Sequence, residues 1–178
     1  MKEGGMPETV IHFLWIGPPT KGDPTAVSGH DVAGPIKMAE KFSEQNKNGL
    51  PTNVVKFWCL EQHEGFYKKQ FLDENADISV CTVESLLKVE EAHVRAQPYI
   101  KGLISRLKLL KENKNTIYCR AKFKDDFSFL ILLIHAGYFL DTNVFPDPEE
   151  NITLLGESRV TAVRSPDGQF DYYFMYSP

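Results

Sequence analysis

The chain has 178 residues, of which 42% are hydrophobic, so it can bury one core of ordinary size but not two. Its 20 basic and 24 acidic residues give a formal net charge of -4 and are scattered along the sequence, which provides no sustained positive field. We therefore expect a single domain over residues 1–178, with no nucleic acid and no anionic membrane surface as partner.

The cysteines do not predict a disulfide framework or a zinc site. Cys59, Cys81 and Cys119 are odd in number and show neither CxxC spacing nor nearby paired histidines. We expect buried thiols in a reducing compartment.

No segment of the sequence predicts a membrane span or an export signal. The longest apolar stretch, residues 127–133, is far shorter than the roughly 18 to 20 residues that a membrane-spanning helix needs. The first apolar run ends at Gly17-Pro18-Pro19 and lacks the features of a secretory signal peptide. These observations favour a soluble protein of the cytoplasm.

A buried strand and a helix are predicted at the start of the chain. Residues 10–16 are apolar at nearly every position, which is the pattern of a strand buried on both faces. Residues 20–32 are rich in Gly, Pro, Ser and Asp and predict a loop. Pro35 then suits the first turn of a helix over residues 35–46.

Strands and helices continue to alternate. Residues 54–60 and 78–81 predict two further strands, and the polar stretch between them, which contains Phe66 and Phe71, predicts a helix. This alternation is typical of an α/β domain with a largely parallel sheet, in which ligands collect at the carboxyl ends of the strands.

The second half of the chain predicts helices followed by short strands. Residues 83–113 are helical in composition, with Pro98 as an interruption. Residues 121–135 form a strongly apolar helix that leads into a strand over residues 138–141. Residues 159–163 and 170–175 then predict a hairpin around residues 165–168.

A candidate ligand site follows the strand at residues 138–141. Asp141 lies at its carboxyl end, where a carboxylate faces the crevice and not the interior of the sheet. Asp141 and Asn143 present two oxygen-bearing side chains suited to a hard divalent cation that also bridges substrate phosphates. The alternative is that both residues form a turn before Pro146.

Two other features point to the same edge of the sheet. Asp125 and Asp126 lie near the start of the preceding helix, where they either cap it or, through Asp125, converge with Asp141 on one pocket. Trp15 ends the first strand, where its ring could lie against a planar base, with Gly17 letting the ligand approach the backbone; the alternative is a core tryptophan.

The two histidines beside these features are interpreted as structural. Neither His12 nor His135 has a partner at metal or catalytic spacing, so both are expected to pack or to end a helix.

Two motifs carry a resemblance to a known family. Residues 11–17, IHFLWIG, resemble the opening strand IHFxWxG of glycosyltransferases with the DXD sugar-binding region, a group that includes the catalytic domains of large clostridial glucosylating toxins and related bacterial effectors. Residues 125–144, DDFSFLILLIHAGYFLDTNV, are similar to the family pattern SDxxRxxxLxxxGGxYxDxDV in order and spacing. Phe57-Trp58 and residues 173–178 resemble the family's second strand and the strand after the DXD.

The resemblance implies a fold and a set of roles. The fold would be GT-A-like, a mostly parallel sheet flanked by helices with a C-terminal antiparallel hairpin. Trp15, with Ile16 and Gly17, would bind the uracil of a UDP-sugar. Asp125 would hold the donor sugar, and Asp141 would contact the ribose or sugar and a Mn²⁺ or Mg²⁺ ion; these two would be the catalytic residues. Asn143 takes the position of the second metal-binding aspartate.

The chain departs from the family pattern at three positions. The helix arginine is replaced by Ser128, which removes a guanidinium that would contact the donor or the departing phosphates. The first glycine of the pair is Ala136, a mild change. Asn143 offers a carbonyl oxygen but one negative charge fewer, so metal affinity should be weaker.

The resemblance favours an enzyme that moves a hexose or N-acetylhexosamine from a UDP-sugar to a protein or glycan acceptor. The alternative is an inactive pseudo-glycosyltransferase that serves as a binding module. A generic nucleotide binder is disfavoured because no GxGxxG or GxxxxGK[ST] loop follows a strand. The family continues beyond the length of this chain, so we expect the N-terminal part of a longer domain, in the cytoplasm or delivered into a host cell without a Sec signal.

Overall fold

The computed structural model describes residues 9–20, 31–48, 53–112, 117–146, 161–164 and 170–177. Strands and helices alternate along the first part of this chain, and a run of helices precedes the last strands. The elements are β1 (Thr9–Trp15), α1 (Ala33–Lys47), β2 (Asn53–Cys59), the 3-10 turn η1 (Glu61–His63), α2 (Glu64–Asp73), β3 (Ile78–Thr82), α3 (Val83–Leu87), α4 (Glu90–Arg95), α5 (Gln97–Lys111), α6 (Ile117–His135), β4 (Gly137–Leu140), β5 (Thr161–Arg164) and β6 (Phe170–Ser177).

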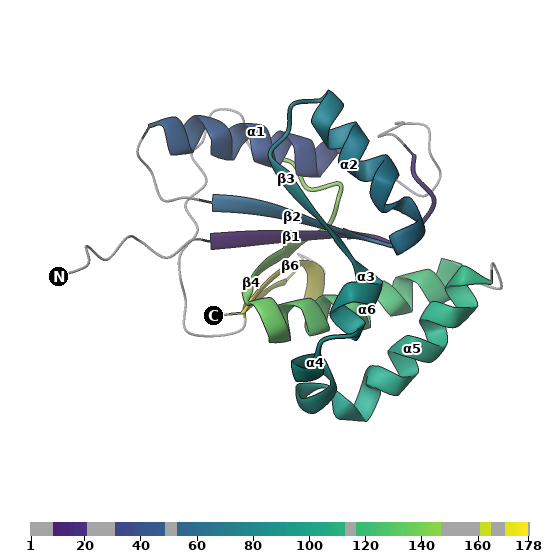
Figure 1. The fold of residues 1–178 in the computed structure, drawn as a ribbon. Helices are drawn as coiled ribbons and strands as arrows, with labels where there is room; N and C mark the ends of the chain where they lie inside the picture. Colours follow the sequence, from purple (N-terminus) through teal and green to yellow (C-terminus); the bar gives the residue numbers. More distant parts are fainter. Residues whose placement is uncertain are drawn as a thin grey trace.

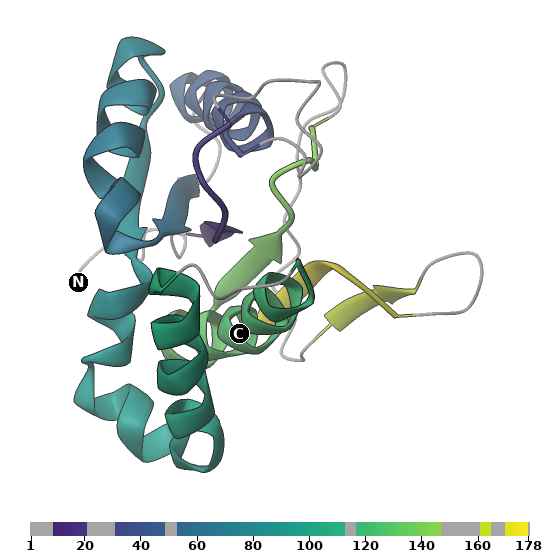
Figure 2. The same ribbon diagram turned by 90° about the vertical axis from the view of Figure 1, so that its right-hand side faces the viewer.

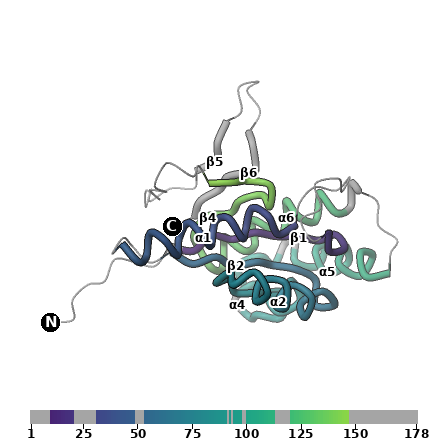
Figure 3. Tube along the Cα trace, turned by 90° about the horizontal axis from the view of Figure 1, so that it is seen from above, coloured from purple at the N-terminus to yellow at the C-terminus, as the bar shows by residue number. Residues whose placement is uncertain are grey.

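The strands form one sheet in the order β3-β2-β1-β4-β6-β5. Strands β1 to β4 form an all-parallel part of this sheet, which confirms the predicted α/β organisation. Strand β6 pairs antiparallel with β4, and β5 pairs antiparallel with β6. Figure 3 shows β1, β2 and β4 from above, and the side view shows the yellow strands β5 and β6 extending away from the helices (Figure 2). Residues 165–168, where a turn was predicted, lie outside the described residues.

Helices cover both faces of the parallel strands, so the sheet carries two cores (Figure 1). Side chains alternate along β1, so Ile11 and Phe13 pack on the side of α1 and α2, whereas Leu14 packs on the side of α3 to α6. Strand β2 divides its side chains in the same way, with Phe57 on the first side and Trp58 on the second. The apolar pattern of both strands is explained by burial on two faces.

The strand order reverses between β1 and β4. From β1 the chain passes through α1 and α2 to β2 and β3 on one side, and α6 then places β4 on the other side of β1. The helices α1 and α2 lie on one face and α6 on the opposite face (Figure 1). Open α/β sheets commonly bind their ligands beside such a reversal, and we use the term crevice for this edge of the sheet, at the carboxyl ends of β1 and β4.

The helices between β3 and β4 confirm one expectation and correct another. The helical stretch is interrupted near Pro98 as predicted, because α4 ends at Arg95 and α5 begins at Gln97, with Pro98 in its first turn, where the missing N–H costs nothing. Helix α6 begins at Ile117, four residues earlier than predicted, so Asp125 and Asp126 lie in its interior, and the interpretation of these two residues as caps is wrong. No helix in the described part of the chain has the length and apolarity to cross a bilayer.

The described cysteines are thiols, as expected. Cys59 is buried and Cys81 is partly buried, and both are free. Burial raises the pKa of the Cys59 thiol to about 12, which keeps it protonated and unreactive near neutral pH. The side chain of Cys119 lies outside the described residues.

Candidate functional site

The end of β1 forms one wall of the crevice. Trp15 is half-buried, and its indole nitrogen donates a hydrogen bond to the carbonyl oxygen of Pro18 at 2.9 Å. The ring lies against Gly17, where a Cβ atom would be 3.1 Å from the indole nitrogen. Trp15 is therefore held at the rim of the α1–α2 core by its own loop. The side chain of Ile16 is buried on the opposite side of the sheet, so only its backbone is available to a ligand.

The loop after β4 forms the second wall. In the parallel register Phe13 lies beside Leu140, so the residues that follow, Trp15 and Asp141, emerge at the same edge from neighbouring strands. The amide of Val144 donates to the carbonyl of Asp141 at 3.0 Å, which closes a tight turn. Thr142 within this turn is buried.

The N-terminus of α1 holds this turn in place. The Gly34 amide donates to the Thr142 carbonyl at 3.1 Å. A Cβ atom on Gly34 would lie 2.3 Å from that oxygen and 2.6 Å from the carbonyl oxygen of Val144. Both atoms belong to the backbone, so only glycine allows the helix and the turn to approach this closely.

A buried histidine holds the connection between α6 and β4. The Nε2 atom of His12 lies 2.8 Å from the Ala136 carbonyl, and its Nδ1 accepts a hydrogen bond from the Trp58 indole at 3.1 Å. These contacts assign the proton to Nε2 and confirm that His12 has a packing role. Burial lowers the pKa of His12 to about 4, so the ring is neutral at physiological pH.

The same connection contains two residues with left-handed backbone. Ala136 has a φ of 52° and Gly137 a φ of 100°. Alanine is strained in the left-handed region by about 1 kcal/mol, so replacement of the family's first glycine by Ala136 is less mild than expected. The strain lies directly between α6 and β4, the elements that carry the acidic residues of the site.

An ion pair joins α6 to the turn after β4. The Lys124 ammonium contacts Oδ1 of Asp141, and the two side chains are 29% and 16% exposed. The same oxygen accepts a hydrogen bond from the Thr142 amide at 2.9 Å. Both contacts of Asp141 in the described part of the chain involve Oδ1, so Oδ2 remains available to a ligand.

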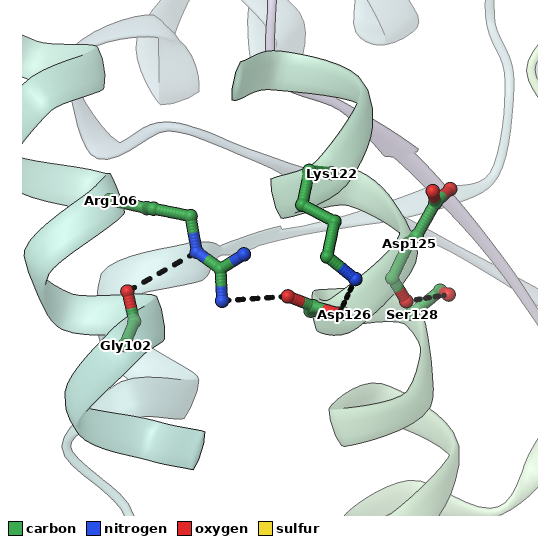
Figure 4. Close-up of polar contacts among 6 residues, drawn as sticks. All are labelled: Gly102, Arg106, Lys122, Asp125, Asp126 and Ser128. Carbon is green, nitrogen blue, oxygen red and sulfur yellow. Dashed lines mark hydrogen bonds and ion pairs between the residues drawn. The ribbon is translucent and has the colours of Figure 1, made fainter. Parts of the chain in front are cut away.

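The neighbouring residues Asp125 and Asp126 face different surroundings. Asp126 pairs with Arg106 of α5 at 2.7 Å and with Lys122 at 2.9 Å. The Asp125 carboxylate points away from this network and has no ion-pair or hydrogen-bond partner among the described residues (Figure 4). Its backbone carbonyl accepts a hydrogen bond from the Ser128 hydroxyl at 2.7 Å.

The environment of Asp125 disfavours its negative charge. Burial raises the pKa of this carboxyl above its usual range, and the carboxylates of Asp126 and Asp141 add to the effect. The ammonium groups of Lys124 and Lys122 act in the opposite direction. Lys124 links the two carboxylates that the sequence suggested would converge, because it contacts Asp141 and precedes Asp125 in α6, whereas the direct effect of Asp141 on the pKa of Asp125 is the smallest of these contributions. A partly buried carboxyl without a partner and with a raised pKa is typical of a functional site.

Two positions that depart from the glycosyltransferase pattern, Ser128 and Asn143, have different surroundings. Ser128 is buried, and its hydroxyl donates a hydrogen bond to the Asp125 carbonyl of the helix backbone. Asn143 is exposed beside the turn, where its amide oxygen is accessible to a cation. The described residues contain no group of three or more His, Cys, Asp or Glu side chains that could hold a metal ion.

Lys124 is the site residue that the sequence interpretation missed. The family pattern has a serine directly before the helix aspartate, and Lys124 occupies that position. The motif spacing alone could therefore have identified a positive charge in the candidate site. Its contact with Asp141 could not be anticipated, because it depends on the rotation of α6 relative to the turn after β4.

The sequence was also compared with known proteins. No family description matches the chain, and no curated protein is detectably similar in sequence.

Proposed function

We propose that this domain is the donor-binding part of a GT-A-like glycosyltransferase that moves a hexose or N-acetylhexosamine from a UDP-sugar to a protein or glycan acceptor. The observation that carries the proposal is the position of Asp125 and Asp141. Asp141 follows β4 at the edge where the strand order reverses, Lys124 of α6 contacts it, and Asp125 is the next residue of that helix. Trp15 lies at the same edge. The resemblance of residues 11–17 and 125–144 to the DXD family supplies the substrate class.

Each side chain of the crevice suits one part of a nucleotide sugar. The half-buried indole of Trp15 can stack on a pyrimidine base. The Asp125 carboxylate, which has no partner among the described residues, can accept hydrogen bonds from sugar hydroxyls. Asp141 begins the turn whose Thr142 carbonyl accepts a hydrogen bond from Gly34 at the start of α1, so the diphosphate would lie beside this turn.

The residues of the turn fit a divalent cation that is shared with substrate. Asp141 offers Oδ2, and the exposed Asn143 offers an amide oxygen. Two protein ligands are few for Mg²⁺ or Mn²⁺, but such ions commonly complete their shell with substrate phosphates and water. When bound there, the cation would stabilise the charge on the departing diphosphate.

The chain's own residues would orient the donor for a substitution at the anomeric carbon. The acceptor nucleophile forms a bond to that carbon, and the bond to the diphosphate oxygen breaks. Asp125 would hold the sugar through hydrogen bonds with its hydroxyl groups. Trp15, stacked on the base, and the turn at Asp141 would hold the nucleotide end of the donor. Together these contacts would orient the anomeric carbon towards the acceptor.

Tryptophan fluorescence provides the test. The chain has two tryptophans, and Trp58 is buried and bonded to His12, so Trp15 should report a stacked base. Titration of UDP-glucose and UDP-N-acetylglucosamine with Mn²⁺ should quench the emission, and the response should be lost in Asp141→Ala. A Trp58→Phe variant should keep the response and a Trp15→Phe variant should lose it.

The quenching experiment needs two further controls. Mn²⁺ alone measures quenching by the ion, and uridine measures stacking without phosphate. If none of the nucleotide sugars changes the emission of a folded protein with Mn²⁺ present, the donor-site proposal is wrong.

The second candidate, a binding module without turnover, has one observation in its favour. The ammonium of Lys124 contacts Oδ1 of Asp141, the carboxylate that is proposed to bind the metal ion. Asn143 stands where the glycosyltransferase pattern has its second metal-binding aspartate. Metal-dependent release of UDP from a UDP-sugar, abolished by Asp141→Ala, would exclude this candidate.

A further inference from the structure

Lys124 is a cation built into the candidate donor site. It extends from α6 to Oδ1 of Asp141, and both side chains are largely buried. It also has the strongest effect among the charged neighbours on the pKa of Asp125, which it lowers against the effect of burial. The Lys124 ammonium therefore forms an ion pair with Asp141 and favours the charged form of Asp125.

The charge balance of the crevice requires such a cation. The carboxylates of Asp125 and Asp141 would repel a diphosphate. Asn143 is neutral, so it binds a divalent cation more weakly than an aspartate at that position would. An ammonium group is a compact charge that commonly binds phosphate. Lys124 therefore supplies, within the chain, part of the positive charge that a weakened metal site lacks.

The position on α6 supports this role. Lys124 and Ser128 are four residues apart and lie on the same side of the helix. Ser128, which replaces the arginine of the family pattern, is buried and bonded to the helix backbone. The pattern has a positive charge at position 128, and this chain has one at Lys124, one helical turn earlier. The Lys124 side chain reaches Asp141 in the loop after β4.

We propose that Lys124 binds the diphosphate of the donor directly, so that nucleotide binding has a component that does not need a metal ion. This inference rests on the proposed donor site. When the nucleotide enters, the ammonium exchanges part of its contact with Asp141 for the phosphate oxygens, and Asp141 becomes available to the cation.

The test compares UDP with uridine by isothermal titration calorimetry in the presence of EDTA. The two ligands share the base and ribose, so their difference in affinity measures the diphosphate contribution without metal. Wild-type protein should bind UDP about tenfold or more tightly than uridine. The Lys124→Met variant should lose this advantage, whereas its affinity for uridine should be unchanged.

Lys122→Met is the matched control. It removes the same charge two residues away on the same helix, from a side chain that pairs with Asp126 and is 50% exposed. This variant should keep the full advantage of UDP over uridine. Lys124→Arg should keep most of it, and it preserves the charge in case the methionine variant fails to fold.

The outcomes separate the two proposals. If wild-type protein binds UDP with Mn²⁺ but binds UDP and uridine equally in EDTA, the role of Lys124 is wrong and the donor site stands. The role is also wrong if Lys124→Met retains the advantage of UDP. If folded wild-type protein binds UDP under neither condition, both proposals fail.

Discussion

The two sides of α6 carry adjacent carboxylates that have opposite environments. On the side facing α5, Asp126 is balanced by Arg106 and Lys122. On the other side, the Asp125 carboxylate has no hydrogen-bond or ion-pair partner among the described residues; burial raises its pKa, and Lys124 and Lys122 offset only part of this effect. The comparison shows that an aspartate of this helix cannot be assigned to a functional site by its residue type alone. A partly buried carboxylate that has no ion-pair partner is the better indicator, because keeping such a charge in the folded protein costs stability.

The largest expected effect separates the two carboxylates by activity. We expect Asp125→Asn to reduce release of UDP from a UDP-sugar in the presence of Mn²⁺ by about a hundredfold or more, because donor orientation depends on this carboxylate. Asp126→Asn should change the rate less than about threefold, because its partners lie on the other side of the helix. Equal losses in the two folded variants would remove the distinction between the sides of α6.

The second prediction concerns His12, which holds the connection between α6 and β4. Its pKa is about 4 in the folded protein, below the usual value of 6.5, so the unfolded chain binds more protons between these values. The contribution of the neutral ring is present above pH 6.5 and is lost as the pH falls towards 4, at a cost of about 3 kcal/mol.

Urea unfolding at pH 7 and pH 4.5 measures this effect. His12→Gln can keep one of the two hydrogen bonds but does not titrate, so its free energy of unfolding should depend less on pH than that of the wild type. His63→Gln, a change at a partly exposed ring, is the control and should keep most of the wild-type dependence. An unchanged pH dependence in His12→Gln would show that other groups cause it.

The third prediction concerns the turn that carries Asp141. Gly34→Ala would place a methyl group 2.3 Å from a backbone oxygen of Thr142, so the turn must move. We expect a loss of about 1–3 kcal/mol in the free energy of unfolding and weaker UDP binding. Gly65→Ala is the matched change, also in the first turn of a helix, and its Cβ meets no described atom within 4 Å.

Gly65→Ala should stabilise the protein by up to about 1 kcal/mol, because alanine favours the helix. Thermal unfolding and UDP titration of the two variants give both comparisons. If Gly34→Ala were as stable as Gly65→Ala and bound UDP normally, the close approach of α1 to the turn would not matter to the site.

The smallest effect is the difference in stability between the two carboxylates of α6. Asp126→Asn should lower the free energy of unfolding by up to about 1 kcal/mol, because it removes two partly exposed ion pairs. Asp125→Asn should cause no loss. Its pKa is raised in the folded state, so the charge opposes folding at neutral pH, and that penalty disappears as the pH falls through the folded pKa. Chemical denaturation at pH 7 would detect a reversal of this order.

The sequence predicted the architecture because hydrophobic patterns determine it. The runs at residues 10–16 and 54–60 are apolar on both faces, and both form central strands. Along α5 the apolar residues recur at helical spacing, and Ile100, Leu103, Leu107 and Leu110 are buried, whereas Ile104 is 44% exposed. Helix ends were less accurate, because the first turns of α6 mix apolar and basic residues without a capping pattern, and Asp125 and Asp126 were taken for its start.

The site was predictable only in part, because its contacts depend on how elements are oriented. The position of Asp141 after a parallel strand was predictable from chain order, as was the structural role of His12. The pairing of Lys124 with Asp141 and the close approach of Gly34 to Thr142 were not. A lysine on a helix is usually solvated, and a glycine before a proline is usually only a helix start, so neither residue type reveals the contact.

The most direct measurement of the central claim is a crystal structure of the protein with UDP and Mn²⁺. We expect the uracil against Trp15, the diphosphate beside Lys124 and Asp141, and the cation between Asp141 and the phosphates. Nucleotide bound instead at the opposite edge of the sheet, in the cleft of about 320 Å³ that is lined by Phe42, Asn53 and Asp77, would contradict the assignment of the donor site to the crevice between β1 and β4.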